Sequence, residues 1–148
     1  MENLRLIVPD NFKEFGKRVN NHIKLIRNTD FDYIVDFNLL RFNNGEGKGI
    51  LLDSIRDKNV YILTDIGNYD ITYEAQRGTH HMMPDEHYQD IKRIISSMNG
   101  EAGQVSLIMP LLYQSRQDKR GLGESLDCAM ALQEMQFYGI KELVTFDA

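Results

Sequence analysis

The densest run of polar side chains that could act on a ligand is Ser115–Arg120, with the sequence Ser-Arg-Gln-Asp-Lys-Arg. Arg116 offers a planar guanidinium that can bind phosphate or stack on a base. The Gln117 amide can hydrogen-bond a base edge or a ribose hydroxyl, and the cations of Lys119 and Arg120 can neutralise phosphate charge. The alternative interpretation is a solvated basic turn, because charged loops are common on protein surfaces.

A second polar run is Arg41–Glu46, with the sequence Arg-Phe-Asn-Asn-Gly-Glu. The Phe42 ring can stack on a flat ligand ring, and Asn44 and Glu46 can accept hydrogen bonds from an amino group or a ribose hydroxyl. The alternative is a simple hairpin turn with Phe42 in the core, since Asn-Asn-Gly is a strong turn signal.

The histidines near the middle of the chain form no recognisable metal site. His80 and His81 are adjacent, so they point apart in a strand and lie about 100° apart on a helix. His87 follows across a proline, and the spacing matches no zinc pattern. We expect solvated loop histidines here.

A glycine-containing segment and the single cysteine are the remaining candidates for chemistry. The segment Gly121–Ser125 precedes a predicted helix, and a helix N-terminus of this kind can hold a phosphate. It is no Walker loop, because no Gly-Lys-Ser/Thr follows at the required spacing, and neither Gly-x-Gly step of the chain continues as a dinucleotide fingerprint. The single cysteine, Cys128, lies in an apolar helical stretch, which indicates a buried, inert thiol and excludes an intrachain disulfide.

Alternating strands and helices must position these side chains. Apolar runs and turn signals predict strands at 4–8, 33–42, 48–52, 59–64, 105–109 and 143–146, and helical periodicity predicts helices at 11–28, 84–98 and 123–139. Asp10 or Asn11 is expected to cap the first helix. This pattern indicates an α/β fold with a mainly parallel sheet, together with a β-hairpin near 40–52.

Two connections, 66–83 and 111–122, lack a regular pattern. A connection as long as the first is usually functional or mobile. The second leaves the carboxyl end of a buried strand, which is the edge at which open parallel sheets bind ligands. The run around Arg116 therefore lies where chemistry is expected.

The composition is that of one soluble globular domain. The chain has 148 residues, of which 42% are hydrophobic and 26% charged, and its net charge is −5. Such an acidic chain is a poor binder of nucleic acid or anionic membranes, and no apolar run approaches the roughly 18 residues of a membrane span. The N-terminus lacks the apolar core of a signal peptide, and with one cysteine this favours the cytoplasm.

Together, the polar runs resemble the N-terminal half of ribose-phosphate pyrophosphokinase, also called phosphoribosyl pyrophosphate synthetase. Arg41–Glu46 is similar to that family's Arg-Phe-x-Asp-Gly-Glu loop, and Ser54–Ile62 to its Ser-x-Arg-Gly-x-Asp-Val-Tyr-Ile segment. Pro110–Arg120 is similar to its Pro-x-x-x-Tyr-Ala-Arg-Gln-Asp-Arg-Lys loop, with the tyrosine one residue further from the arginine. Leu143–Asp147 is similar to the strand that leads into its Asp-x-His motif.

The resemblance implies a three-layer, phosphoribosyltransferase-like α/β fold, with a twisted sheet flanked by helices. It also implies Mg²⁺-dependent transfer of the β,γ-diphosphoryl group of ATP to the 1-hydroxyl of ribose 5-phosphate. By resemblance, ATP lies between loops of two neighbouring subunits, so a homo-oligomer is expected, at least a dimer and in typical members a hexamer. The residues implied in ATP binding are Arg116, Gln117, Asp118, Phe42, Asn44 and Glu46.

The sequence departs from the family pattern in three places. Asn44 stands where the family usually has Asp, so an acceptor-only carboxylate becomes an amide. The connection 66–83 is an insertion. Ser54 and Arg56 match part of the family's regulatory phosphate site, but Ser96–Glu101 lacks the basic Lys-Arg pair of that site.

By resemblance, the family's metal-binding histidine would come directly after Ala148, and its sugar-phosphate segments and catalytic lysine lie in the other half. We therefore expect residues 1–148 to be the N-terminal domain of a larger protein, and to hold neither a catalytic residue nor a metal ligand. Two alternatives stay open: a non-catalytic regulatory homologue of the family, and an unrelated nucleotide-binding α/β domain.

Overall fold

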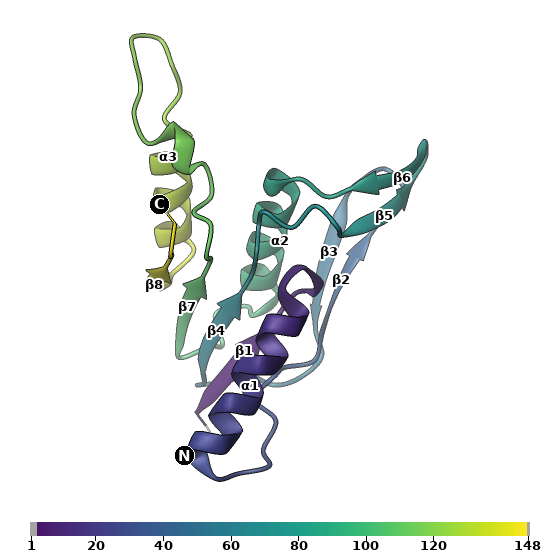
Figure 1. Cartoon of the computed structure of the whole chain (residues 1–148), viewed down its shortest axis with the longest axis vertical. Helices are drawn as coiled ribbons and strands as arrows, with labels where there is room; N and C mark the ends of the chain where they lie inside the picture. The colour runs from purple at the N-terminus through teal and green to yellow at the C-terminus, as the bar shows by residue number, and fades with distance from the viewer. Residues whose placement is uncertain (1–2, 148) are drawn as a thin grey trace.

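A four-stranded parallel sheet forms the centre of the computed structural model, which describes residues 3–147 (Figure 1). In spatial order, its strands are β1 (Leu4–Ile7), β4 (Asn59–Leu63), β7 (Gln104–Ile108) and β8 (Ile140–Val144). All three strand pairs are parallel. Beyond β1, an isolated parallel bridge between Leu6 and Ile34 adds one more short segment to the sheet.

Helices cover both faces of this sheet. α1 (Lys13–Arg27) lies on one face, and α2 (Pro84–Ser97) and α3 (Asp127–Phe137) lie on the other. Adjacent residues of β4 belong to opposite cores, because successive side chains of a strand point to opposite faces. Leu63 belongs to the cluster on which α1 packs, whereas Ile62 belongs to the cluster that contains Ile91 of α2.

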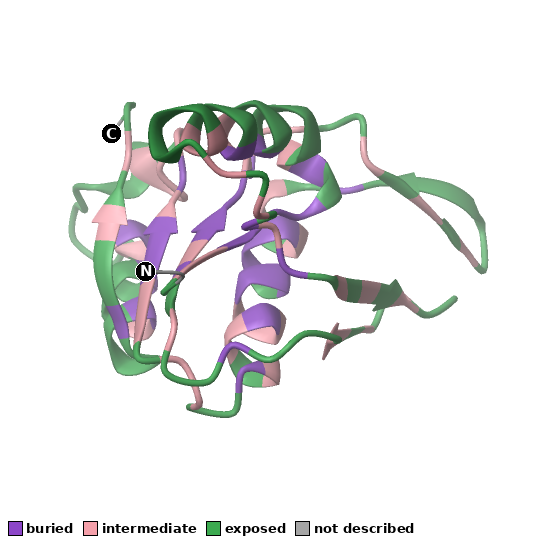
Figure 2. Ribbon diagram, turned by 90° about the horizontal axis from the view of Figure 1, so that it is seen from below, coloured by how far each residue is buried: buried purple, intermediate pink, exposed green. Residues whose placement is uncertain are grey.

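Buried residues concentrate on the central strands and on the helix surfaces turned toward them (Figure 2). Val60, Ile62 and Leu107 are completely inaccessible to solvent. Strands buried on both faces are typical of parallel sheets between helices. The predicted three-layer α/β fold with a mainly parallel sheet is confirmed.

Two antiparallel hairpins lie together on one side of the sheet (Figure 1). The predicted hairpin near 40–52 consists of β2 (Phe37–Arg41) and β3 (Gly47–Leu51). The second consists of β5 (Thr72–Ala75) and β6 (Gly78–His81), inside the connection 66–83 that was expected to lack regular structure. Its strands are short and mostly exposed, so the period-2 apolar signal that identifies strands is almost absent from them.

Three predicted elements have wrong boundaries. The predicted helix 123–139 begins only at Asp127, because Gly123 has a φ of +82° and residues 121–124 form a turn. The predicted strand 33–42 is interrupted: residues 33–35 pair with β1, and β2 begins at Phe37. At the other end of the chain, β8 begins three residues before the predicted strand 143–146.

The expected cap of the first helix is also wrong. A short 3-10 helix, η1 (Asp10–Phe12), precedes α1, and Phe12 occupies the N-cap position without a side-chain hydrogen bond. The Asn11 amide is buried and instead donates to the Thr64 hydroxyl at 2.9 Å. Asn11 therefore joins the carboxyl ends of β1 and β4 rather than capping the helix.

Candidate functional site

The loop around Arg116 leaves the carboxyl edge of the sheet, as predicted. It follows β7, and its first residues run beside the end of the chain: Leu111 bridges to Asp147, and the Leu112 N–H donates to the Asp147 carbonyl at 3.0 Å. The carboxyl ends of β7 and β8 therefore meet at the base of this loop.

Tyr113 fixes the base of the loop to α2. Its ring stacks on that of Tyr88, with centroids 4.1 Å apart and planes within 7°. Its hydroxyl donates to the Asp85 carboxylate at 2.7 Å. Burial raises the pKa of the Tyr113 hydroxyl, and the acceptor Asp85 adds to this, so the hydroxyl stays a donor at neutral pH. The base of the loop is therefore held in place.

Beyond this base, the loop is open to solvent. Arg116 and Gln117 lie in a short 3-10 helix, η2 (Ser115–Gln117), and Asp118 ends it; the side chains of all three are exposed. Within residues 3–147, Arg116 has no hydrogen bond or ion pair. The Gly121 N–H donates to the Glu124 carboxylate at 2.7 Å and closes the far end as a turn. The short helix η2 lies against α3, and the residues that follow it project well clear of that helix (Figure 1).

The loop between β2 and β3 is a tight turn with exposed side chains. The Phe42 N–H donates to the Glu46 carbonyl, and the Gly45 N–H donates to the Phe42 carbonyl, both at 2.8 Å. Gly45 has a φ of +88°, which favours glycine. The Asn44 side-chain oxygen accepts from the Glu46 N–H at 3.1 Å. The loop is closed by its own backbone, and its side chains are directed to solvent.

Phe42 is 50% exposed. The alternative that placed its ring in the core is therefore wrong, and the ring is accessible to a flat ligand. Asn44 and Glu46 are exposed beside it.

Below this loop lies a buried ion-pair cluster that the sequence did not indicate. The Arg41 guanidinium contacts the Asp90 carboxylate at 2.7 Å, and Arg93 contacts the other Asp90 oxygen at 2.6 Å. The side chains of Arg41 and Asp90 are each only 10% exposed. Arg41 also donates to the Gly45 carbonyl at 3.4 Å, so the cluster reaches the turn itself.

The structure does not bring the two predicted loops together within one chain. In Figure 1, the loop that carries Arg116 rises at the left above α3, whereas the hairpin that carries Phe42 lies at the right, with α2 and the sheet between them. The six residues implied in ATP binding are thus divided between two separate surfaces of the molecule.

The predicted phosphate residues Ser54 and Arg56 lie at the opposite edge of the sheet. Both precede β4, at the amino ends of the strands, whereas Arg116 follows the carboxyl ends. The Arg56 guanidinium contacts the Glu101 carboxylate at 3.0 Å. A phosphate bound there would lie beside the Glu101 carboxylate, and the phosphate role of Ser54 and Arg56 stays a prediction.

The prediction of a solvated histidine is wrong for His87. It lies in the first turn of α2 and is only 2% exposed. Its Nδ1 lies 3.1 Å from the Asn11 amide nitrogen, and its Nε2 lies 2.8 Å from the Asn68 carbonyl oxygen. His87 therefore belongs to a buried polar network with Asn11 and Thr64, while His80 and His81 are exposed, as expected.

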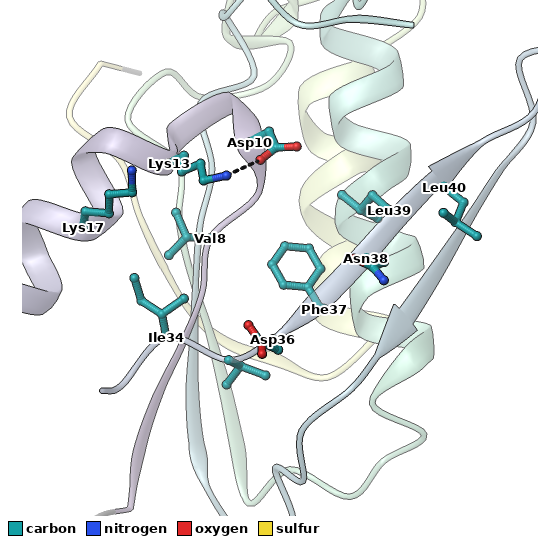
Figure 3. Close-up of a pocket in the computed structure, with 11 residues that line it drawn as sticks. Val8, Asp10, Lys13, Lys17, Ile34, Asp36, Phe37, Asn38, Leu39 and Leu40 are labelled. Carbon is teal, nitrogen blue, oxygen red and sulfur yellow. Dashed lines mark hydrogen bonds and ion pairs between the residues drawn. The ribbon is translucent and has the colours of Figure 1, made fainter. Parts of the chain in front are cut away.

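A cavity of about 430 Å³ lies between the end of β1, the start of α1 and residues 34–40 (Figure 3). Val8, Ile34 and Phe37 give it apolar walls, and Lys13 contacts the Asp10 carboxylate at 3.5 Å on its rim. The residues that line it include none of the candidate site residues. This cavity is therefore separate from both predicted loops.

Within residues 3–147, no group of three or more His, Cys, Asp or Glu side chains is arranged to hold a metal ion. No helix in this range is long and apolar enough to cross a membrane.

Comparison with known proteins gives the family. The model of the N-terminal domain of ribose phosphate pyrophosphokinase matches residues 4–139. The crystal structure of phosphoribosylpyrophosphate synthetase from Mycobacterium smegmatis aligns with a TM-score of 0.74 at 17% sequence identity, over 97% of this chain and 42% of that chain. This chain thus spans less than half the length of that synthetase, and among curated proteins none matches it significantly. With residues 4–139 matched and the fold shared, the chain belongs to the family of the N-terminal domain of ribose phosphate pyrophosphokinase.

Proposed function

We propose that this chain is the ATP-binding N-terminal domain of a longer enzyme. That enzyme transfers the diphosphoryl group of ATP to ribose 5-phosphate and forms phosphoribosyl pyrophosphate. The observation that carries the proposal is the loop after β7, which is anchored at its base by Tyr113 and Asp85. It presents an exposed Arg116, without an ion pair among residues 3–147, at the carboxyl edge of the sheet. This is the edge at which parallel sheets bind ligands.

The side chains of this loop suit the reaction. Diphosphoryl transfer asks the protein mainly for positioning and charge neutralisation. The Arg116 guanidinium can bind ATP phosphates or stack on adenine, and the Gln117 amide can hydrogen-bond the base or ribose, with Asp118 beside them. Mg²⁺ enters as part of the substrate, bound to the phosphates of ATP. The net charge of −5 does not oppose this, because the local field is set by the loop cations and the metal.

The loop of Phe42, Asn44 and Glu46 is proposed to complete the ATP site of a neighbouring subunit. Its separation from Arg116 within one chain supports this arrangement. The exposed Phe42 ring can stack on adenine, and the polar side chains beside it can hydrogen-bond the base and ribose. A homo-oligomer, at least a dimer, follows from the proposal.

The proposal is tested by measuring phosphoribosyl pyrophosphate formation from ATP, Mg²⁺ and ribose 5-phosphate. The longer protein should be active, and the 148-residue chain alone should be inactive. Arg116→Ala should lower the activity of the longer protein at least about tenfold, because a charge-assisted contact contributes roughly 1.5–3 kcal/mol.

Arg18→Ala is the matched control, since it removes one exposed arginine from α1. It should leave the activity within about twofold of the unmodified protein. If the longer protein binds Mg²⁺-ATP but forms no product, the chain belongs to a non-catalytic regulatory homologue. If it neither binds ATP nor forms product, the proposal is wrong.

A further inference from the structure

We infer that the β5–β6 hairpin is a positioning element for the Phe42–Glu46 loop, and that Gln76 and Arg41 transmit its effect. The inference rests on the proposed function, because it takes that loop to contact ATP. The second hairpin packs against this loop from outside the β2–β3 pair and keeps the loop in one conformation before a ligand binds.

The two hairpins are joined by a direct hydrogen bond. The Gln76 N–H donates to the Asn43 carbonyl at 3.0 Å. Gln76 and Arg77 form the two-residue turn between the paired Ala75 and Gly78, so this N–H is not needed inside its own hairpin. The tip of one hairpin thus holds the backbone of the other.

The Tyr73 side chain makes a second contact. Its hydroxyl oxygen would lie 3.3 Å from a Cβ atom on Gly45, so the tip of this side chain lies directly against the turn. The Tyr73 ring also lies under the Arg41 guanidinium, 5.2 Å from centroid to Cζ, in a cation–π contact. Arg41 therefore bonds the Gly45 carbonyl on one side and contacts the second hairpin on the other.

The β5–β6 hairpin is itself fixed to the start of α2 through Glu86. The Glu86 carboxylate accepts from the Tyr73 hydroxyl at 2.8 Å and from the Met83 N–H at 3.0 Å, and it lies 3.1 Å from His80 Nε2. Burial works against the charged form of Glu86, but these bonds outweigh it and lower the pKa of the carboxyl. A carboxylate charged at neutral pH therefore fastens both strands of the hairpin to a helix of the core.

This arrangement matters because, within residues 3–147, the Phe42–Glu46 loop is otherwise ordered only by the hydrogen bonds of its own turn and by Arg41. Its side chains are exposed, and a segment with few buried apolar contacts has low local stability. Ordering a loop when a ligand binds costs affinity, and a loop that is already ordered avoids that cost. Loss of the hairpin contact should therefore raise the KM for ATP and leave kcat nearly unchanged.

The test compares Gln76→Pro with Gln76→Ala. Proline has no N–H, so it removes the bond to Asn43. Gln76 has a negative φ and is the first residue of its turn, a position that favours proline. Alanine keeps the N–H and serves as the matched control. The measurements are amide hydrogen exchange at residues 42–46 without ligand, and the KM values for ATP and ribose 5-phosphate in the longer protein.

We expect Gln76→Pro to lower the exchange protection of Phe42 and Gly45 and to raise the KM for ATP about threefold to tenfold. The KM for ribose 5-phosphate and kcat should stay within about twofold, and Gln76→Ala should behave like the unmodified protein. If Gln76→Pro fails to fold, Tyr73→Leu and Tyr73→Phe replace it: the leucine variant loses the ring under Arg41, and the phenylalanine variant retains it.

Unchanged protection in Gln76→Pro would overturn the inference, and so would lost protection with an unchanged KM for ATP. Both results would leave the proposed function intact. An unmodified protein that neither binds nor uses ATP would instead refute the proposed function itself, and the inference with it.

Discussion

Subunit mixing tests whether the proposed ATP site is shared between two subunits. The loop of Arg116 and the loop of Phe42 lie on separate surfaces of one chain, so a site that uses both must draw them from two subunits. Arg116→Ala and Phe42→Ala should each be nearly inactive alone at ATP concentrations below KM. Loss of a base–aromatic stack costs roughly 1–3 kcal/mol, and loss of the guanidinium contact about as much.

The activity expected from an equal mixture of the two variants follows from the fraction of sites in which both loops are intact. A site is intact only if its arginine loop comes from a Phe42→Ala subunit and its phenylalanine loop comes from an Arg116→Ala subunit. Each condition holds for half of the sites, so random exchange in a symmetric assembly restores about a quarter of full activity. Sites built within one chain would recover nothing, because every chain carries one defective loop.

The assay is phosphoribosyl pyrophosphate formation after the two variants have been unfolded and refolded together, with subunit exchange verified by a tag on one variant. As a control, Arg116→Ala is mixed with the double variant, which offers no intact pairing and should stay inactive. Activity no higher than that of the separate variants, under verified exchange, would refute a shared site.

Three further predictions concern stability and reactivity. Gly49→Ala should lower the free energy of unfolding in urea by about 1–3 kcal/mol, because its Cβ would lie 2.8 Å from the Arg93 carbonyl oxygen; an unchanged midpoint would contradict the packing of β3 on α2. The hydrogen bond from Tyr88 lowers the pKa of Glu134 below its ordinary value of 4.5. The charged Glu134 carboxylate therefore stabilises the folded chain above pH 4.5, and this stabilisation is lost as the pH falls through the lowered pKa. Glu134→Gln should therefore reduce stability at pH 7 by less than about 1 kcal/mol and have no effect at pH 2, as thermal unfolding will show. Burial raises the pKa of the Cys128 thiol, so a disulfide reagent should label the native chain at least about tenfold more slowly than the unfolded chain, and equal rates would place the thiol at the surface.

The sequence alone predicted secondary structure correctly wherever a strong local signal coincided with burial. The run of β-branched residues that begins at Asn59 predicted β4 to within one residue of its end. Pro84, followed by two acidic residues, predicted the start of α2, because proline suits the first helical turn and carboxylates suit the positive end of the helix dipole. Asn44 and Gly45 predicted the turn between β2 and β3.

Features that depend on distant partners could not be predicted in this way. The β5–β6 hairpin is exposed and is held by Glu86 and Asn43 rather than by an apolar face. His87 is polar in the sequence, and its partner Asn11 is far away along the chain, so nothing local indicated its burial. Arg41 and Asp90 are likewise distant, and only the packing of β3 on α2 brings them together.

For the candidate site, the sequence predicted the positions of the loops but not the roles of their residues. The positions of both loops followed from strand ends and turn signals, whereas the roles of Arg116 and Phe42 came from family resemblance and stay predictions. The two loops lie apart in one chain because of the topology. The Arg116 loop follows β7, whereas the Phe42 loop joins β2 and β3, which lie on the other side of α2 in space.

The order of strands in the sheet follows the order of the chain, and this bears on how the protein folds. β1 pairs with β4 at Leu4 and Asn59, β4 with β7 at Asn59 and Gln104, and β7 with β8 at Val105 and Ile140. The loops to be closed thus shorten toward the C-terminus, but closure entropy grows only with the logarithm of loop length, so the three closures differ by less than about 1 kcal/mol. Loop length therefore favours no pair, and burial decides instead. Three fully buried side chains, Val60, Ile62 and Leu63, lie in β4, and Leu107 of β7 lies beside them, with Ile91 and Ile94 of α2 in the same core. We therefore expect β4 and β7 to pair first, with α2 across them, and folding to slow most when their side chains are shortened.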